Sequence, residues 1–559
     1  MCEMAVVLRW LKRLAIGFVV LLMVAYAGLW WLTRYASVST HGDVDLGAGN
    51  IMVPSERTQS WMMRSGVTDS LLAHWAAREI GEWKSEGKVT IPRILIGKLA
   101  SGQDIEFVNA YLQDRQPRGT VGSTGPFHKT GDYDFTLAGL SLLLYAFGDQ
   151  SDVLYPKTVD HIVNVLMTQE GGTPKIYTPR ILGLPLRDTE NHILMTEGSR
   201  YLKNRWKARH GDLDKKYDNV TNGLEAWLVA YLEGMARAGL HEYNSRPYLG
   251  YTLTALLNLE SFTAEPVRVA ARRVLDRANW EYALGSLTFR RFPPFRRQAS
   301  HARDTDLDGD YHTGVMKAWM SLAGVDGLFI RQGAHQALWV PLTSYRPADA
   351  VMKWVIEKPE HYFVQVGHGH DGSPEIYSGG PGYLITAGGV ADDPARQCVA
   401  RPTTLMLEDG VMDLSGLLQV AGPDTTYQTW NNTGVYQNLA VSAGPVSVPK
   451  DWIAVAENDT WRIFERAGHR MAVYSTDHLG IFCVLPDGKP TDLLAGLILA
   501  NGDAEVLKTH FKWPDGSAIA YDVHAPKDQW VIVSVDGVAV DRNFGRWPLM
   551  QGEVPGGHR

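Results

Sequence analysis

The sequence predicts an α+β protein in which a helical domain is followed by a domain of antiparallel β-sheet. The chain has 559 residues, more than one compact core usually holds, so we expect two large domains. From about residue 60 to 325, apolar residues recur at helical spacing. After about residue 330, short runs rich in β-branched and aromatic residues alternate with turn residues. This order indicates an all-helical layer or ring followed by a sheet domain.

The first 35 residues (1–35) predict a membrane anchor or a signal segment. Leu14 to Leu32 is a run of nineteen residues without charge, long enough to cross a bilayer. Three basic residues precede it: Arg9, Lys12 and Arg13. They favour an inner-membrane anchor with the bulk of the chain outside the cytoplasm, and the interfacial pair Trp30-Trp31 supports an uncleaved helix. Because Ala25-Tyr26-Ala27 fits a cleavage site, a secreted or periplasmic protein released from its signal peptide is the alternative.

The rest of the chain divides into a polar linker (36–60), a helical domain (61–328) and a sheet domain (329–559). Five segments with helical spacing predict the helices: LAGLSLLLYAF, VDHIVNVLM, GLEAWLVAYLEGMARAGL, YTLTALLNLESF and EPVRVAARRVLDRANWEYAL. Eight short runs predict the strands: ALWVPL, YFVQVG, YLITAGG, WRIFERAG, MAVYST, IFCVLP, AIAYDVHA and WVIVSVDGVAV.

Composition narrows the classes of partner. A net charge of −7, without a long Lys/Arg block or zinc-finger spacing, argues against nucleic acid. The 18 Trp and 23 Tyr fit a large core and also suit sugar-stacking surfaces in a cleft. Cys398 and Cys483 both lie in the sheet domain and could pair. The chain has no GxSxG elbow, HExxH or P-loop, and His368 with His370 gives too few metal ligands, so we expect no cofactor.

Two polar segments of the helical domain predict ligand contacts near a helix start. In GSTGPFHKTGDYDF, the side chains of His128 and Lys129 lie in a Gly-rich loop, where Lys129 could meet an anionic substrate. In RDTENHILMTEGSRYL, Asn191 and His192 open a helix that Asp188 or Thr189 could cap. A neutral amide and an imidazole can donate hydrogen bonds to a carboxylate without the full desolvation cost of an ion pair.

Two further segments are dense in titratable side chains. GLHEYNSRPYLGYTLTALLNL carries, among others, Glu242, Tyr243 and Tyr248 before or at a helix start. FRRFPPFRRQASHARDTDLDGDYHTG holds five arginines, residues suited to bidentate recognition of carboxylate or phosphate: Arg290, Arg291, Arg296, Arg297 and Arg303.

The same arginine-rich segment opens like a calcium loop. Asp304, Asp306 and Asp308 precede Gly309 in the D-x-D-x-D-G pattern of such loops. Val315 stands at the twelfth position, where the bidentate glutamate is expected, so a calcium site here would lack its closing ligand.

Asn, His, Tyr, Glu and Arg side chains together suit β-elimination on a uronic-acid polysaccharide. The C5 proton beside the uronate carboxylate is weakly acidic, so an enzyme must first neutralise that carboxylate with hydrogen-bond donors. A base then removes the C5 proton and an acid protonates the departing O4. Tyrosine can serve as either if a neighbouring arginine favours its phenolate.

These residues resemble the toroid-type polysaccharide lyases, the group that holds alginate, glucuronan, heparin and chondroitin lyases. The pair Asn191-His192 resembles the pair that contacts the substrate carboxylate in alginate and heparinase-type members. HEYNSRPYLGY resembles their catalytic-tyrosine segment, which implies catalytic roles for Tyr248 and Glu242. RRFPPFRR followed by Tyr311 is similar to an Arg/Tyr segment of the glucuronan and alginate lyases. The resemblance implies an incomplete α/α toroid, and it leaves Tyr248, Tyr311 and His192 as alternative bases.

The resemblance leaves several alternatives open. The substrate of a lyase of this kind could be alginate, glucuronan or a glycosaminoglycan. A glycoside hydrolase on a helical toroid would instead need a pair of carboxylates. The residues that could supply it are Asp132, Asp134, Glu190 and Glu242. A membrane-anchored protein that binds an acidic glycan without cleaving it is the non-enzymatic alternative.

Overall fold

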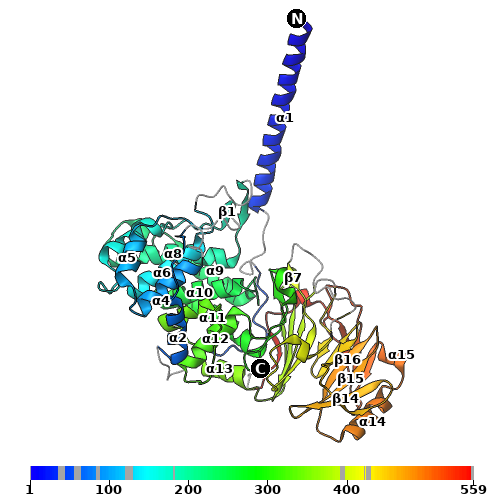
Figure 1. Cartoon of the computed structure of the whole chain (residues 1–559). Coiled ribbons are helices and arrows are strands. Elements are labelled where there is room, and N and C mark those ends of the chain that lie inside the picture. Colours follow the sequence, from blue (N-terminus) through cyan, green and yellow to red (C-terminus); the bar gives the residue numbers. More distant parts are fainter. Residues whose placement is uncertain are drawn as a thin grey trace. The chain divides into compact units, whose positions relative to one another are not determined.

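The computed structural model describes residues 2–35, 44–55, 64–83, 89–119, 130–179, 183–390, 397–420, 422 and 430–555. It is a mixture of helices and antiparallel sheets, as the α+β prediction requires (Figure 1). Its contacts group the chain into two compact units, Met1–Thr40 with Ala77–Leu224 and His41–Ala76 with Glu225–Arg559. We call them unit 1 and unit 2 and describe each by itself.

The described residues of unit 1 form helices and one short β-hairpin. Its elements are α1 (Cys2–Tyr35), α4 (Thr90–Ala100), α5 (Ile105–Gln113), α6 (Asp134–Phe147), α7 (Pro156–His161), the π-helix η3 (Ile162–Leu166), β1 (Tyr177–Pro179), β2 (Pro185–Arg187), α8 (Glu190–Arg209) and η5 (Lys215–Tyr217). Helix α6 packs against α4 and α8. A Cβ at Gly139 of α6 would lie 2.6 Å from the Cβ of Pro92 in α4, so glycine permits this close approach.

Helix α1 contains the apolar run of the N-terminus. The stretch Val7–Thr33 has 27 residues with a hydropathy of 2.1, long and apolar enough to cross a membrane. None of this window is buried against the rest of the protein. These properties fit either a transmembrane anchor or a signal segment.

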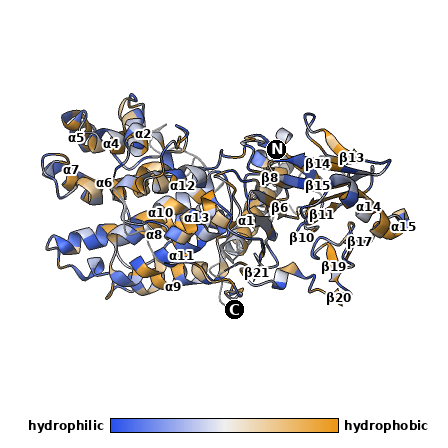
Figure 2. Cartoon of the chain, turned by 90° about the horizontal axis from the view of Figure 1, so that it is seen from below, coloured by the Kyte–Doolittle hydropathy of each residue, from blue (hydrophilic) through white to orange (hydrophobic). Residues whose placement is uncertain are grey.

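Most helices of unit 2 precede its two large sheets in the sequence. They are α2 (Gly66–Ala76), α9 (Leu224–Ala238, whose first residue belongs to unit 1), α10 (Tyr248–Phe262), α11 (Glu265–Leu284), η6 (Ala299–Arg303), α12 (Tyr311–Leu322), η7 (His335–Leu342) and α13 (Asp349–Ile356). Helix α10 packs against α11, and α12 packs against η7 and α2. Figure 2 shows hydrophilic and hydrophobic residues on both α9 and α11, as expected of helices that bury one face.

The strands of unit 2 form two large antiparallel sheets. The seven-stranded sheet has the order β12 (Val446–Ser447), β9 (Leu418–Val420), β8 (Thr403–Leu407), β6 (Tyr383–Gly388), β5 (Glu375–Gly380), β4 (Tyr362–Val366) and β21 (Gln551–Glu553). The six-stranded sheet has the order β10 (Val435–Tyr436), β11 (Leu439–Ser442), β16 (Gly480–Leu485), β15 (His469–Ser475), β14 (Trp461–Arg466) and β13 (Ala454–Glu457). In the register, Tyr377 of β5 faces Val364 and Thr386 of its neighbours.

Smaller elements complete unit 2. A four-stranded sheet contains β17 (His510–Lys512), β18 (Ala518–Tyr521), β19 (Ile532–Val535) and β20 (Val538–Ala539). A short pair joins β3 (Phe295–Arg296) to β7 (Cys398–Val399). Further helical elements among the described residues are η8 (Leu414–Gly416), α14 (Pro490–Ala500), α15 (Ala504–Leu507) and η9 (Phe544–Arg546).

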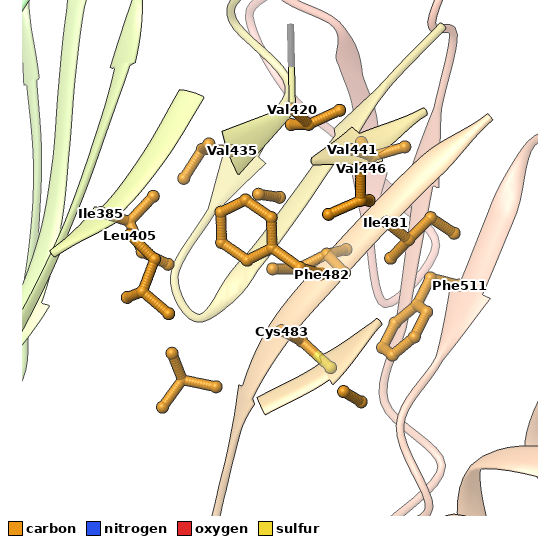
Figure 3. Close-up of a cluster of buried hydrophobic side chains, with 14 of the residues drawn as sticks. Ile385, Leu405, Val420, Val435, Val441, Val446, Ile481, Phe482, Cys483 and Phe511 are labelled. Carbon is orange, nitrogen blue, oxygen red and sulfur yellow. The ribbon is translucent and has the colours of Figure 1, made fainter. Parts of the chain in front are cut away.

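The sheet part has a core built from side chains of both large sheets. Figure 3 shows Ile385 and Leu405 of the seven-stranded sheet in one cluster with Phe482 and Cys483 of the six-stranded sheet. All four are at most 1% exposed. Burial of these strands accounts for the short runs of β-branched and aromatic residues that predicted them.

Three local predictions differ from the structure. ALWVPL, predicted as a strand, lies in the 3-10 helix η7, where every residue from His335 to Pro341 is buried. A short apolar run without alternation does not separate strand from buried helix. VDHIVNVLM is divided between α7 and η3. The region predicted as sheet from residue 329 also contains helix α14. Its first strand, β4, begins only at Tyr362, after helix α13.

Candidate functional site

Asn191 and His192 occupy the first turn of α8, as predicted. Thr189 is the N-cap in extended backbone, with φ −81° and ψ 167°, but its side chain does not cap the helix. Instead the Thr189 hydroxyl accepts a hydrogen bond from Asn191 Nδ2 at 3.0 Å. Asn191 is completely buried. The helix therefore begins with a fixed amide rather than with a capping side chain.

The imidazole of His192 is held by the first turn of α6. Its Nδ1 lies 2.5 Å from Asp134 Oδ2, and its ring meets Phe135 edge-on with the ring centroids 5.4 Å apart. A carboxylate at one ring nitrogen fixes the orientation and the tautomer of an imidazole. Asp134 thus makes His192 suitable for hydrogen bonding to an anion or for proton transfer.

Farther along α8, buried polar side chains anchor neighbouring backbone. Glu197 accepts hydrogen bonds from Arg200 Nε at 2.7 Å and from the Lys175 amide at 2.9 Å. Lys203 donates to the carbonyl of Met167 at 2.8 Å. These contacts tie the chain that precedes the β1–β2 hairpin to α8, a structural role.

In unit 2, Tyr248 is the first residue of α10 and lies among polar partners. Gln298 Nε2 donates a hydrogen bond to the Tyr248 hydroxyl at 2.8 Å, and the guanidinium of Arg297 lies 4.3 Å from the centre of its ring. Arg297 also pairs with the buried carboxylate of Glu242. The structure therefore brings together three predicted residues, Glu242, Tyr248 and Arg297, around one phenol.

The loop that carries Arg297 and Gln298 is conformationally unusual. Both residues are in the left-handed region, with φ of 72° and 59°. For residues other than glycine this conformation costs roughly 1–2 kcal/mol each, so it persists only where surrounding contacts enforce it. One such contact is the hydrogen bond from the Arg297 amide to the Gln397 carbonyl at 2.8 Å. The result is that both side chains are directed to Tyr248.

Tyr311 is the first residue of α12 and lies near the same helix start. A Cβ at Gly250, two residues beyond Tyr248, would lie 3.0 Å from the Cβ of Tyr311. Its ring centroid is 5.4 Å from that of His335. Burial raises the pKa of Tyr311, and the positive charge of Arg246 opposes this increase only in part. Tyr311 therefore keeps its proton at neutral pH.

The calcium prediction is not supported by the arrangement of its three aspartates. Arg246 Nη1 lies 3.2 Å from Asp304 and 3.0 Å from Asp306, and Lys317 Nζ lies 2.9 Å from Asp308. Within the described part of the chain, no group of three or more His, Cys, Asp or Glu side chains is placed to hold a metal ion. Basic side chains already neutralise the carboxylates that the calcium pattern had suggested.

A buried polar network supports the loop before Tyr248. Tyr243 stacks on His368 with the ring centroids 3.7 Å apart, and His368 Nε2 lies 2.7 Å from Glu375 Oε1. Glu375 also accepts hydrogen bonds from Asn244 Nδ2, at 2.6 Å, and from the hydroxyl of Tyr377. This network links the loop to strand β5 and to the segment before it.

Arg291 continues this network rather than facing solvent. It is 3% exposed, it donates to Asn244 Oδ1, and its Nε lies 3.3 Å from Asp310 Oδ2. Burial alone would raise the pKa of Asp310, but the positive charge of Arg291, together with Arg246 and the hydrogen bond from the Thr313 amide, outweighs burial and lowers that pKa. Arg291 is thus placed to support the site rather than to contact a substrate.

The other predicted residues have diverse positions. Arg296 is buried in β3, and its amide donates to the Tyr243 carbonyl at 3.1 Å. Arg303 is exposed at the end of η6. His128 and Lys129 lie outside the described residues. Cys398 and Cys483, which the sequence left able to pair, do not form a disulfide: both are free and buried.

Four residues of these clusters were not predicted in their roles: Asp134, Gln298, His368 and Glu375. The sequence offered Asp134 only as an acid of a hydrolase. Its position at the start of α6 is the signal that could have suggested a contact with His192 at the start of α8. His368 was considered only as a metal ligand. Nothing local in the sequence links it to Glu375 or to Tyr243, because the link is formed by folding alone.

The chain was also compared with known proteins. No family model matches it, and no curated protein sequence matches it significantly.

Proposed function

We propose that this protein is a polysaccharide lyase that cleaves a uronic-acid polysaccharide by β-elimination. The observation that carries the proposal is the phenol of Tyr248, which receives a hydrogen bond from Gln298 and lies against the guanidinium of Arg297. The hydrogen bond and the guanidinium together hold the phenol in one direction, and a phenol fixed in this way suits a residue that exchanges a proton with C5 of a bound uronate.

The two tyrosines suit different steps. Tyr248, with Arg297 beside it, is proposed as the base that takes the C5 proton. Tyr311 keeps its proton because burial raises its pKa, so it suits the acid that protonates the departing O4. Glu242 holds Arg297 in place and is a positioning residue. His192 is the alternative base, and its contact with Asp134 supports that alternative.

Carboxylate recognition is proposed for Asn191 and His192. Both lie in the first turn of α8, where the helix dipole favours a negative charge. The sequence resemblance implies the same role for this pair, and it also implies that the helices within 61–328 form an incomplete α/α toroid. The apolar helix Val7–Thr33 supports a further part of the proposal, an exported protein that acts on its glycan while attached to the inner membrane.

The decisive experiment follows ultraviolet absorbance while the purified chain from about residue 40 is mixed with mannuronan, guluronan, glucuronan, hyaluronan, chondroitin and heparan. Elimination leaves a conjugated double bond that absorbs, whereas hydrolysis leaves only new reducing ends. Absorbance that rises with at least one polymer is the expected result. New reducing ends without absorbance would contradict the proposal and favour a hydrolase, and binding without cleavage would favour a glycan-binding protein.

The Tyr248→Phe variant tests the proposed base. Loss of the hydroxyl should lower kcat by roughly 10²–10⁴-fold, the usual contribution of general acid–base catalysis. Tyr436→Phe is the matched control, since it removes a phenol from strand β10 and should leave the rate unchanged. Full activity of Tyr248→Phe would shift the role of base to His192, which the corresponding His192→Ala variant then tests.

A further inference from the structure

A cavity of about 250 Å³ lies beside Tyr311 in unit 2. Besides Tyr311, its polar lining residues include Asp308, Asp310, Lys317 and Arg331. Its volume is just below the ~300–1,000 Å³ of pockets that enclose drug-sized ligands, so it suits one sugar ring rather than a longer fragment. The cavity adjoins the proposed acid, where a sugar next to the cleaved bond would be bound.

The charges that line the cavity compensate one another. Lys317 Nζ lies 2.9 Å from Asp308 Oδ2, and Arg331 contacts Asp308 while its Nη1 lies 2.6 Å from Asp306 Oδ2. Asp310 is paired with Arg291. A second uronate carboxylate in this cavity would meet two aspartates and would have to displace them from cations that they already neutralise.

A neutral sugar encounters no such repulsion. The hydroxyl and amide groups of a neutral sugar both donate and accept hydrogen bonds. The carboxylates that line the cavity can accept from these groups, and the lysine and arginine can donate to them. Asp308 is 8% exposed and is paired with both Lys317 and Arg331. The ammonium of Lys317 and the guanidinium of Arg331 each carry several N–H groups, so they can donate to a sugar hydroxyl while they stay paired with Asp308.

We infer that this cavity binds a neutral sugar adjacent to the uronate, so that the substrate is an alternating polymer of uronic acid and a neutral hexosamine. This inference rests on the proposed lyase function and narrows its substrate class. Homopolymers of uronic acid carry a carboxylate on every ring and would place one in the cavity.

The first test compares initial rates on hyaluronan and unsulfated chondroitin with those on glucuronan and mannuronan. We expect at least a roughly tenfold preference for the alternating polymers, about the effect of one charge-assisted hydrogen bond. If the homopolymers were cleaved as fast as the alternating polymers or faster, the inference would be overturned, whereas the lyase function would be supported. Absence of elimination with every polymer would overturn the lyase function, and the inference with it.

Variants of the cavity provide a second test. Asp308→Asn removes one carboxylate and leaves Lys317 and Arg331 able to take a uronate, so the preference for alternating polymers should fall roughly tenfold. Asp487→Asn is the matched control, because it makes the same change of charge at a fully exposed side chain that pairs with Arg470. Its preference should equal that of the unmodified protein.

A variant at the half-exposed Arg331 covers the case in which Asp308→Asn fails to fold. Arg331→Gln leaves the cavity with an excess of negative charge, so cleavage of homopolymers should fall further than cleavage of alternating polymers. An unchanged preference in every folded variant would contradict the inference.

Discussion

Replacement of Glu375 by glutamine tests whether the buried network holds unit 2 together. Glu375 is 2% exposed and accepts hydrogen bonds from His368 Nε2 at 2.7 Å, from Asn244 Nδ2 at 2.6 Å and from the Tyr377 hydroxyl. Each bond to a charged acceptor contributes roughly 1.5–3 kcal/mol. Glutamine keeps the shape but turns one acceptor into a donor that faces other donors. We therefore expect the free energy of unfolding to fall by about 3–5 kcal/mol, as when other buried charge pairs are broken.

Denaturation in guanidinium chloride, followed by tryptophan fluorescence, measures this loss. The control is Glu465→Gln, because Glu465 is 42% exposed and pairs with Arg470 at 3.3 Å. An exposed pair of this kind contributes at most about 1 kcal/mol. If Glu375→Gln lost no more than this control, the network would not have the energetic role that its geometry indicates.

The loss of stability caused by Glu375→Gln should depend on pH. Burial acts to raise the pKa of Glu375, but hydrogen bonds from His368 and its other donors outweigh burial and hold the pKa below its ordinary value of 4.5. A lowered carboxyl pKa stabilises the fold above the unfolded value, and this stabilisation is lost as the pH falls through the folded value. The difference between Glu375→Gln and the unmodified protein should therefore be complete at neutral pH and shrink below about pH 4.5.

Three further predictions concern other parts of the chain. Asp134→Asn should lower kcat/KM about 10²-fold and alter its pH profile, because His192 loses the carboxylate that orients it; an unchanged profile would make Asp134 merely structural. Burial lowers the pKa of Lys358 to about 7. Between about pH 7 and 10.5 only the unfolded chain retains the Lys358 proton, so the free energy of unfolding should rise with pH across this range. Denaturation at several pH values measures this slope, which should be absent in Lys358→Met. Removal of residues 1–35 should move the protein from the membrane fraction to the soluble fraction, and N-terminal sequencing of the full chain separates an anchor from a cleaved signal.

The fold class could be predicted because it depends on local periodicity. Helical spacing identified α6, α9, α10 and α11, since apolar residues recur in each over several helical turns. Periodicity failed for η7, which is buried on all sides and so shows no alternation. The prediction of α+β with antiparallel sheet is confirmed, whereas the toroid stays a prediction.

The candidate site could be predicted only in part. Polar residues at helix starts are visible in sequence, and Tyr248, Asn191 and His192 were found in this way. Which arginine contacts the tyrosine was not visible, because five arginines lie in one segment. Folding buries Arg291 beside Asp310 and leaves Arg297 over the phenol, a distinction set by the left-handed backbone at Arg297 and by tertiary contacts.

The buried network is better explained by geometry than by stability. A buried charge pair is often no more stabilising than apolar side chains of the same volume, so strength alone does not account for its presence. Asn244 shows what a polar network adds: its amide donates to Glu375 and to the Pro294 carbonyl at 3.0 Å, and accepts from Arg291. Hydrogen bonds in several directions fix both the position and the rotation of this residue, which apolar contacts do not. Asn244 lies four residues before Tyr248, so the same bonds fix the start of α10 and thereby the direction of the phenol.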